Sequence, residues 1–355
     1  MKRFSWPGGK RGDSMNSQPE SGNKAHPVAS LSLDLDDKWT YMKTHGDARW
    51  SQYPSYLNVV VPRVLRLLDK LSQRITFFIV GQDAEFPRNW RVLSSIAEAG
   101  HEIGNHSFHH EPWLHLYSKE DIEKELARAE DAIGNATGRH VVGFRGPGFS
   151  ISEAVGEVLA SRGYRYDAST LPTFLGPLAR AYYLMTAKLD KDEKRRRARL
   201  FGRLRDGLRP LKPYRWYTAA GPLVEVPVTT MPIVRTPFHL SYIVWLHSHS
   251  PHTARLYLDS AVSLCRTAGI APSFLLHPLD FLGPREAEEL AFFPGMNVPL
   301  HEKLLLAEEV ICQLQNVWQL SPLGDHAAEF AAGAMTASAG TAASNRQLNA
   351  GSLRQ

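Results

Sequence analysis

Short apolar stretches alternate with helical patterns along most of this 355-residue chain, and this alternation most limits what the chain can fold into. Strands are expected at residues 28–35, 75–80, 101–105, 141–144, 164–166, 223–228 and 273–276. Helices are expected at residues 57–71, 89–99, 152–162 and 253–268, with others beginning at Ser118 and near Leu300. Repeated alternation of this kind predicts an α/β fold with a mostly parallel sheet or barrel, in which chemistry occurs at the C-terminal ends of the strands.

The folded part is expected to be one catalytic domain spanning residues 29–322. Residues 1–28 are polar and rich in Gly and Ser, and residues 323–355 consist mainly of small and polar side chains. Neither end carries enough apolar surface to offset the entropy of ordering, so we expect a disordered tail at each. A basic helical insertion is expected within the domain, at about residues 171–216.

Composition excludes several other classes of protein. With only Cys265 and Cys312, the chain cannot form a cysteine-based zinc site or a dense disulfide framework. No apolar stretch approaches the roughly 18–20 residues that span a bilayer, and the N-terminus lacks the apolar run of a signal peptide. We therefore expect a cytoplasmic enzyme.

The first polar cluster follows the strand expected at 28–35. Alternation along an extended segment places Asp34 and Asp36 on one face, with Asp37 next along the chain. Two carboxylates on one face repel each other, unless one binds a metal and the other holds or releases a proton. A solvated acidic turn is the alternative interpretation of this cluster taken alone.

The second cluster contains three histidines. His106 and His110 are four residues apart, so in one helical turn both imidazoles face the same way and can share an ion, while His109 points elsewhere. A histidine-rich polar loop is the alternative. Together with one aspartate, the two imidazoles would give three protein ligands and leave a position open for water, which is typical of a catalytic site for a zinc-like ion.

Two further clusters follow later strands. Arg145 could pair with one of the aspartates, and the glycines at 146 and 148 would let backbone amides approach a substrate closely. His277 ends an apolar strand, where a general acid could stand. A tight turn and a structural histidine are the respective alternatives.

In this order, the clusters resemble the NodB-type polysaccharide deacetylases, carbohydrate esterase family 4. The motifs that carry the resemblance are Asp34-Leu35-Asp36, His106-Ser107-Phe108-His109-His110, Arg145-Gly146-Pro147 and Leu275-Leu276-His277, and they cover about residues 29–285. The chain departs from the commonest first motif, which has adjacent aspartates, and is similar to divergent members with an Asp-x-Asp spacing. The resemblance implies a distorted (β/α) barrel and one divalent metal ion, with zinc preferred.

The resemblance also implies roles for individual residues. Asp34 is the base that activates a metal-bound water, Arg145 orients Asp34, and His277 protonates the leaving amine. Asp36, His106 and His110 are the metal ligands, and Asp36 is preferred to Asp37 because it shares a face with Asp34. Possible supporting or substrate-contacting residues are Asp37, Trp39, Gly148, Phe149 and Asp167.

The function predicted from this resemblance is removal of an N-acetyl group from an amino sugar in a polysaccharide, oligosaccharide or glycolipid. A second enzymatic reading uses the same residues in a deformylase or amidase that acts on a lipid-linked sugar, a nucleotide sugar or a small amide. A third reading is a non-catalytic carbohydrate-binding relative.

The net charge of +5 is unevenly distributed along the chain. Between Lys188 and Arg215 there are twelve Lys and Arg against four Asp and Glu, so this segment carries +8 and the rest of the chain −3. An apolar stretch that precedes the basic run suits a membrane surface or an anionic glycolipid, which we expect to meet residues 171–216. A solvated insertion is the alternative, and a nucleic-acid partner is not expected.

Overall fold

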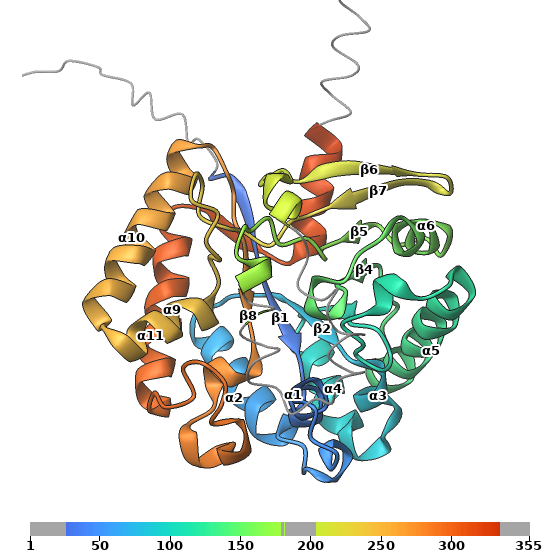
Figure 1. The fold of residues 1–355 in the computed structure, drawn as a ribbon, viewed down its shortest axis with the longest axis horizontal. Helices are drawn as coiled ribbons and strands as arrows, with labels where there is room; N and C mark the ends of the chain where they lie inside the picture. The colour runs from blue at the N-terminus through green and yellow to red at the C-terminus, as the bar shows by residue number, and fades with distance from the viewer. Residues whose placement is uncertain (1–25, 179–180, 182–203, 334–355) are drawn as a thin grey trace, which may run out of the picture.

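A computed structural model of the chain describes residues 26–178, 181 and 204–333 (Figure 1). Nearly all of the tail expected at 1–28 lies outside these residues. So does the central part of the basic insertion.

Nine strands form one mixed sheet, in the order β6-β7-β5-β4-β3-β2-β1-β8, with β9 beside the first residues of β1. The strands are β1 (Val28–Leu35), β2 (Thr76–Ile79), β3 (Glu102–Asn105), β4 (Gly143–Phe144), β5 (Tyr166–Asp167), β6 (Tyr214–Thr218), β7 (Gly221–Glu225), β8 (Ser273–Leu276) and β9 (Gln319–Ser321). All neighbouring pairs are parallel except β6 and β7, which form an antiparallel hairpin. The predicted α/β fold is confirmed.

Helices surround the strands in Figure 1 and cover the outside of the curved sheet. They are α1 (Lys38–His45), α2 (Leu57–Lys70), α3 (Gly81–Glu85), α4 (Pro87–Glu98), α5 (Lys119–Thr137), α6 (Glu153–Ser161), α9 (Leu240–His249), α10 (Pro251–Thr267) and α11 (Leu300–Gln315). Helix α5 begins where the sequence predicts, because the Ser118 side chain accepts a hydrogen bond from Asp121 N. Buried apolar faces such as Ile122, Leu126, Ala129 and Ile133 pack these helices onto the sheet.

The sheet curves into a half-barrel whose two ends are joined by the extended segment at 226–230. Val228 N donates to Thr170 O just past β5, and Thr229 N donates to Ser273 O at the start of β8, at 2.8 and 3.1 Å. The C-terminal ends of the parallel strands therefore converge around one axis. Asp34, the end of β3 at Asn105, Arg145 and His277 all lie at this end of the strands.

One predicted boundary differs from the structure. Residues 323–333 are helical, and Leu323, His326 and Ala327 are buried, so ordered structure continues beyond 322 into the expected tail. Leu323 N donates to Thr76 Oγ1 and His326 Nδ1 lies 3.0 Å from Ser30 Oγ, which anchors this segment on β2 and β1. A few apolar side chains that reach the sheet are enough to order an Ala-rich segment.

Strand β6 begins at Tyr214, in the last residues of the segment expected for the basic insertion, and pairs along β7. Helix α9 was not predicted from the sequence. Among the described residues, no helix is both long and apolar enough to cross a membrane.

Candidate active site

The end of β1 positions the acidic cluster. Asp34 lies in the strand, whereas Asp37 is the N-cap of α1. Asp37 Oδ1 accepts from Lys38 N at 2.7 Å and from Tyr56 N at 3.1 Å, so this carboxylate is committed to holding the chain where β1 ends. Asp36 stands between them with its side chain free to meet the histidines.

The loop at 106–110 brings His106 and His110 together, although it is not the helical turn that the spacing suggested. Ser107 and His110 have positive φ angles of 61° and 51°, and the backbone is irregular. Glu125 of α5 fixes this path, because its Oε1 accepts from Phe108 N and His109 N at 3.1 and 2.6 Å. Its Oε2 lies 2.7 Å from His109 Nδ1, which turns His109 away from the other two rings as expected.

Asp36, His106 and His110 form a compact buried group, and their candidate ligand atoms lie within 4.8 Å of one another. Asp36 Oδ1 is 2.9 Å from His110 Nε2 and 3.3 Å from His106 Nε2. Burial alone would raise the pKa of Asp36, but His110 and His106 outweigh it and hold that pKa far below its usual range. Burial opposes the charged form of His106, yet Asp34 and Asp36 raise its pKa.

The donor set fits a metal ion. His106 Nδ1 is 2.6 Å from Arg145 O, and because a carbonyl oxygen only accepts, Nδ1 carries a hydrogen. The Nε2 atom of a neutral His106 then presents a lone pair to Asp36 Oδ1, which has no hydrogen-bond partner among the described residues. A proton or a metal cation can bridge these buried atoms, and two imidazoles with one carboxylate are a zinc-type donor set.

The guanidinium of Arg145 forms a buried ion pair with Asp34. Its side chain is fully buried, and Nη1 donates to Asp34 Oδ1 at 2.8 Å and to Ser32 Oγ at 2.9 Å. Nε donates to Ala168 O at 2.9 Å, and the guanidinium lies 4.6 Å from the centre of the Phe78 ring. These contacts orient the Asp34 carboxylate.

His277 lies across β1 from this group. The register pairs Leu33 with Leu276, so Asp34 and His277 both follow the last pair of β1 and β8. The ring is half-buried, and Nδ1 lies 2.9 Å from Ser241 Oγ on α9. Asp280 Oδ2 accepts from Ser241 Oγ at 3.1 Å and from His277 N at 2.8 Å.

Residues 30–166, which contain three of the four motifs, match the family model of the polysaccharide deacetylases. These residues carry the sequence pattern of a polysaccharide deacetylase domain. A Mycobacterium smegmatis structure classed with the polysaccharide deacetylases has the same fold, with a TM-score of 0.57 and 20% identity over 90% of this chain and 96% of that one. The Puue allantoinase structure also shares the fold, with a TM-score of 0.54 and 17% identity over 90% of this chain and 95% of that one.

The chain is also similar to curated proteins. It is 31% identical to a peptidoglycan deacetylase of Helicobacter pylori over 114 residues, which cover 32% of this chain and 38% of that protein. It is 30% identical to the peptidoglycan deacetylase-like protein FGM2 of Gibberella zeae over 175 residues, covering 47% of this chain and 48% of that protein. The chain thus spans less than half the length of these two relatives.

Asp167 supports the Arg145 turn from behind. It pairs in register with Glu225 across β5 and β7, and both side chains are fully buried. Asp167 accepts a hydrogen bond from Ser169, whose Oγ in turn accepts from Gly146 N at 2.7 Å. Burial and the neighbouring Asp167 carboxylate raise the pKa of Glu225 well above its usual value.

Of three other predicted residues, the structure changes the interpretation of one, Trp39. Trp39 is 7% exposed and donates from Nε1 to Asp83 Oδ1 at 2.8 Å, so it supports the site and offers no open face for a sugar ring. Gly148 is exposed in a turn with φ 58°, and Phe149 beside it is half-buried with φ 61°. These two remain candidates for substrate contact.

Sequence reasoning missed four residues that hold the site: Glu125, Glu225, Ser241 and the side-chain role of Asp280. Asp280 follows His277 by three residues, which is the spacing of a capping box and could have been recognised. The other three come from distant elements, and no local pattern marks them.

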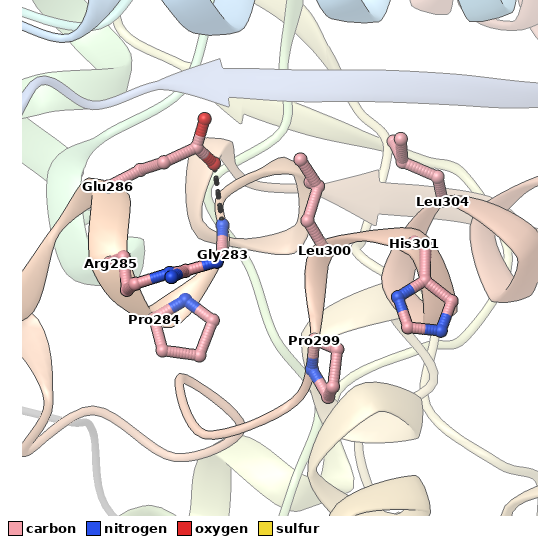
Figure 2. A pocket seen from close by; sticks show the side chains of 8 residues that line it. All are labelled: Gly283, Pro284, Arg285, Glu286, Pro299, Leu300, His301 and Leu304. Carbon is pink, nitrogen blue, oxygen red and sulfur yellow. Dashed lines mark hydrogen bonds between the residues drawn. The ribbon is translucent and has the colours of Figure 1, made fainter.

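A hollow of about 610 Å³ lies apart from these residues. It is lined by Gly283–Glu286 and by the first turns of α11, and Glu286 Oε2 accepts from Gly283 N at 2.8 Å (Figure 2). Arg63 of α2 pairs with Glu286 at 2.7 Å. None of the site residues lines this hollow.

Proposed function

We propose that this protein is a metal-dependent hydrolase that removes an N-acetyl group from an amino sugar, in a polysaccharide, an oligosaccharide or a glycolipid. The observation that carries the proposal is the buried group of Asp36, His106 and His110, whose candidate ligand atoms lie within 4.8 Å of one another, beside an aspartate that Arg145 holds. When bound there, a divalent ion such as zinc would polarise the acyl carbonyl and lower the pKa of water.

The protein's own residues would divide the remaining work. Asp34, held by Arg145, would take a proton from the attacking water. His277, on the other side of β1, would give a proton to the departing amine nitrogen. Asp36, His106 and His110 would hold the ion, and the bond from His106 Nδ1 to Arg145 O fixes the ring so that Nε2 faces it.

Two competing functions use the same residues. A deformylase or amidase would accept a lipid-linked sugar, a nucleotide sugar or a small amide. The structure named as an allantoinase has the same fold. A non-catalytic carbohydrate-binding relative would bind sugar without releasing acid. Acetate and formate release from acylated oligosaccharides, nucleotide sugars and glycolipids separates these three functions.

Asp34→Asn is the decisive variant for the proposed mechanism. It keeps the size of the side chain and removes the base, so we expect acetate release to fall by roughly 10²–10⁴-fold while zinc content stays the same. Asp69→Asn, an exposed position on α2, is the matched control and should leave both unchanged. Unchanged acetate release by zinc-loaded Asp34→Asn would reject Asp34 as the base.

We also propose that the region around the insertion at 171–216 contacts an anionic membrane or glycolipid, at the inner face of the cytoplasmic membrane. Leu204 and Leu208 are 62% and 73% exposed on one 3₁₀ turn, next to the exposed Arg205. Aliphatic side chains beside cations suit an anionic lipid surface. Both cysteines are free thiols, as is usual in a reducing compartment.

Vesicle binding tests this contact. Leu204→Ser with Leu208→Ser should weaken binding to phosphatidylglycerol vesicles by about tenfold, and binding to phosphatidylcholine vesicles should be weak throughout. Leu256→Ser with Leu305→Ser, at exposed leucines of α10 and α11, is the control pair. Equal binding by both pairs would reject the proposal.

A further inference from the structure

The hydrogen bonds around His277 form a directional chain. Asp280 Oδ2 receives two donors, the backbone N–H of His277 at 2.8 Å and the Ser241 hydroxyl at 3.1 Å. The same serine oxygen lies 2.9 Å from His277 Nδ1. Helix α9 thus inserts one hydroxyl between the imidazole and the carboxylate.

The position of the single serine hydrogen sets the state of the imidazole. A carboxylate is a stronger acceptor than a neutral ring nitrogen, so the Ser241 hydrogen points at Asp280. Ser241 Oγ can then only accept from the ring, which requires a hydrogen on His277 Nδ1. In this tautomer Nε2 is the ring atom that exchanges protons with a substrate.

Two donors on Asp280 Oδ2 favour the ionised carboxylate and act against the effect of burial. Burial raises the pKa of Asp280, while His277, its backbone N–H and the Ser241 hydroxyl act in the opposite direction. Lys303 of α11 is 1% exposed and donates to Leu279 O and Leu282 O at 2.8 and 2.9 Å. Its ammonium also lowers the pKa of Asp280 and ties the turn after β8 to α11.

Two other titratable groups face this array. The His239 ring centre is 5.8 Å from that of His277, but His239 Nδ1 accepts from Tyr242 N, and burial lowers the pKa of His239 to about 3. Tyr41 of α1 has a buried hydroxyl, and burial with Asp36, Asp280 and Asp34 raises its pKa well above the usual value. Both groups stay neutral near pH 7, so within the described part of the chain Asp280 is the one charge linked to His277 through hydrogen bonds.

We propose that Ser241 and Asp280 are positioning residues for His277, which fix its Nδ1–H tautomer and aim Nε2 at the leaving nitrogen. This inference rests on the proposed function. The bond between the acyl carbon and the nitrogen breaks as the nitrogen takes the Nε2 proton. His277 is then neutral with Nδ1 still protonated, and the proton that Asp34 took from water returns through solvent to restore both groups.

The tautomer can be measured without any substrate. In ¹⁵N-labelled, zinc-loaded protein, the ring nitrogens of His277 should show the Nδ1–H form above the pH at which the ring loses its charge, with His277→Gln identifying the signals. Ser241→Ala should give a mixture of tautomers, and Ser241→Thr should restore the single form. A single Nε2–H tautomer in the wild type would overturn the proposal.

Kinetics supply the second measurement. Ser241→Ala should lower kcat for deacetylation about tenfold and leave KM almost unchanged. This loss is smaller than the roughly 10²–10⁴-fold that general acid catalysis supplies, because His277 itself is still present. Asp280→Asn should move the basic limb of the kcat profile to lower pH by about one unit, because loss of the negative charge disfavours the imidazolium. Ser248→Ala is the matched control, since this serine of α9 donates to Trp245 O at 2.7 Å.

These measurements separate failure of the inference from failure of the proposed function. If the wild type releases no acetate, the proposed function fails, and the NMR experiment still decides whether Ser241 sets the tautomer. If the wild type is active but Ser241→Ala keeps one tautomer, the wild-type kcat and the wild-type pH profile, then Ser241 has no positioning role. Unfolding by urea should show that Ser241→Ala and Ser248→Ala are equally folded.

Discussion

The two sides of the site, one on each side of β1, are constructed differently. On the metal side, Asp34, Asp36, His106 and His110 are at most 8% exposed, and each of their supports is a backbone group or a buried charge. On the acid side, His277 is half-buried and depends on one hydroxyl from a helix that lies 36 residues earlier in the chain. A site that must hold an ion needs rigid ligands, whereas a group that must receive and release a proton needs access.

The largest effect expected from this comparison is the separation of metal binding from acid catalysis. Asp36→Ala removes the one carboxylate of the ligand group, so zinc content should be lost and acetate release should fall by roughly 10⁴-fold or more. His277→Gln should reduce acetate release yet keep one zinc per chain. Metal analysis beside an acetate assay checks both, and loss of zinc in His277→Gln would mean that the two sides are not independent.

Next in size is the loss of the buried charge behind Asp34. Arg145→Met leaves the Asp34 carboxylate buried without its partner, which should lower the free energy of unfolding by about 3–5 kcal/mol. Arg128→Met is the control, because Arg128 is 51% exposed in its pair with Glu85 and should cost less than about 1 kcal/mol. Equal midpoints in urea unfolding would show that Arg145 does not stabilise the metal side.

A smaller effect is expected from Glu125, which holds the 106–110 loop without reaching the ligand group. Glu125→Gln removes the charge that binds two backbone amides and His109, so zinc affinity should fall by about 10–100-fold. Competition with a chelator measures this change. Glu130→Gln on the same helix, where Glu130 pairs with Arg162 instead, should leave zinc affinity unchanged.

The smallest effect concerns the acid side and pH. Burial lowers the pKa of Lys303 from 10.5 in the unfolded chain to about 8 in the folded one, so between these values the unfolded chain binds more protons. The free energy of unfolding should therefore rise with pH in this window, by at most about 1.4 kcal/mol per unit from this group. Lys303→Met should remove that part of the slope, and an identical slope in both proteins would contradict the assignment.

The sequence predicted the parts of the fold and site that depend on local pattern. The strand–helix order correctly predicted the mostly parallel sheet, and the alternation along β1 predicted that Asp34 and Asp36 share a face; both act on His106. The convergence of His106 and His110 was predicted from a helical turn that does not exist, and Glu125 achieves it instead. Glu225 and Ser241 were beyond prediction, because their roles depend on which distant elements become neighbours.

The packing of the C-terminal segment against β1 and β2 has a consequence for how the domain folds during synthesis. The hydrogen bond between Ser30 and His326 spans 296 residues, and β1, which starts the sheet, pairs with both β8 and β9 from the far end of the domain. Folds dominated by such non-local pairs form slowly. During synthesis, β1 emerges first but keeps an open edge of Leu31 and Leu33 until β8 arrives, so the nascent domain carries an aggregation-prone strand for most of its translation.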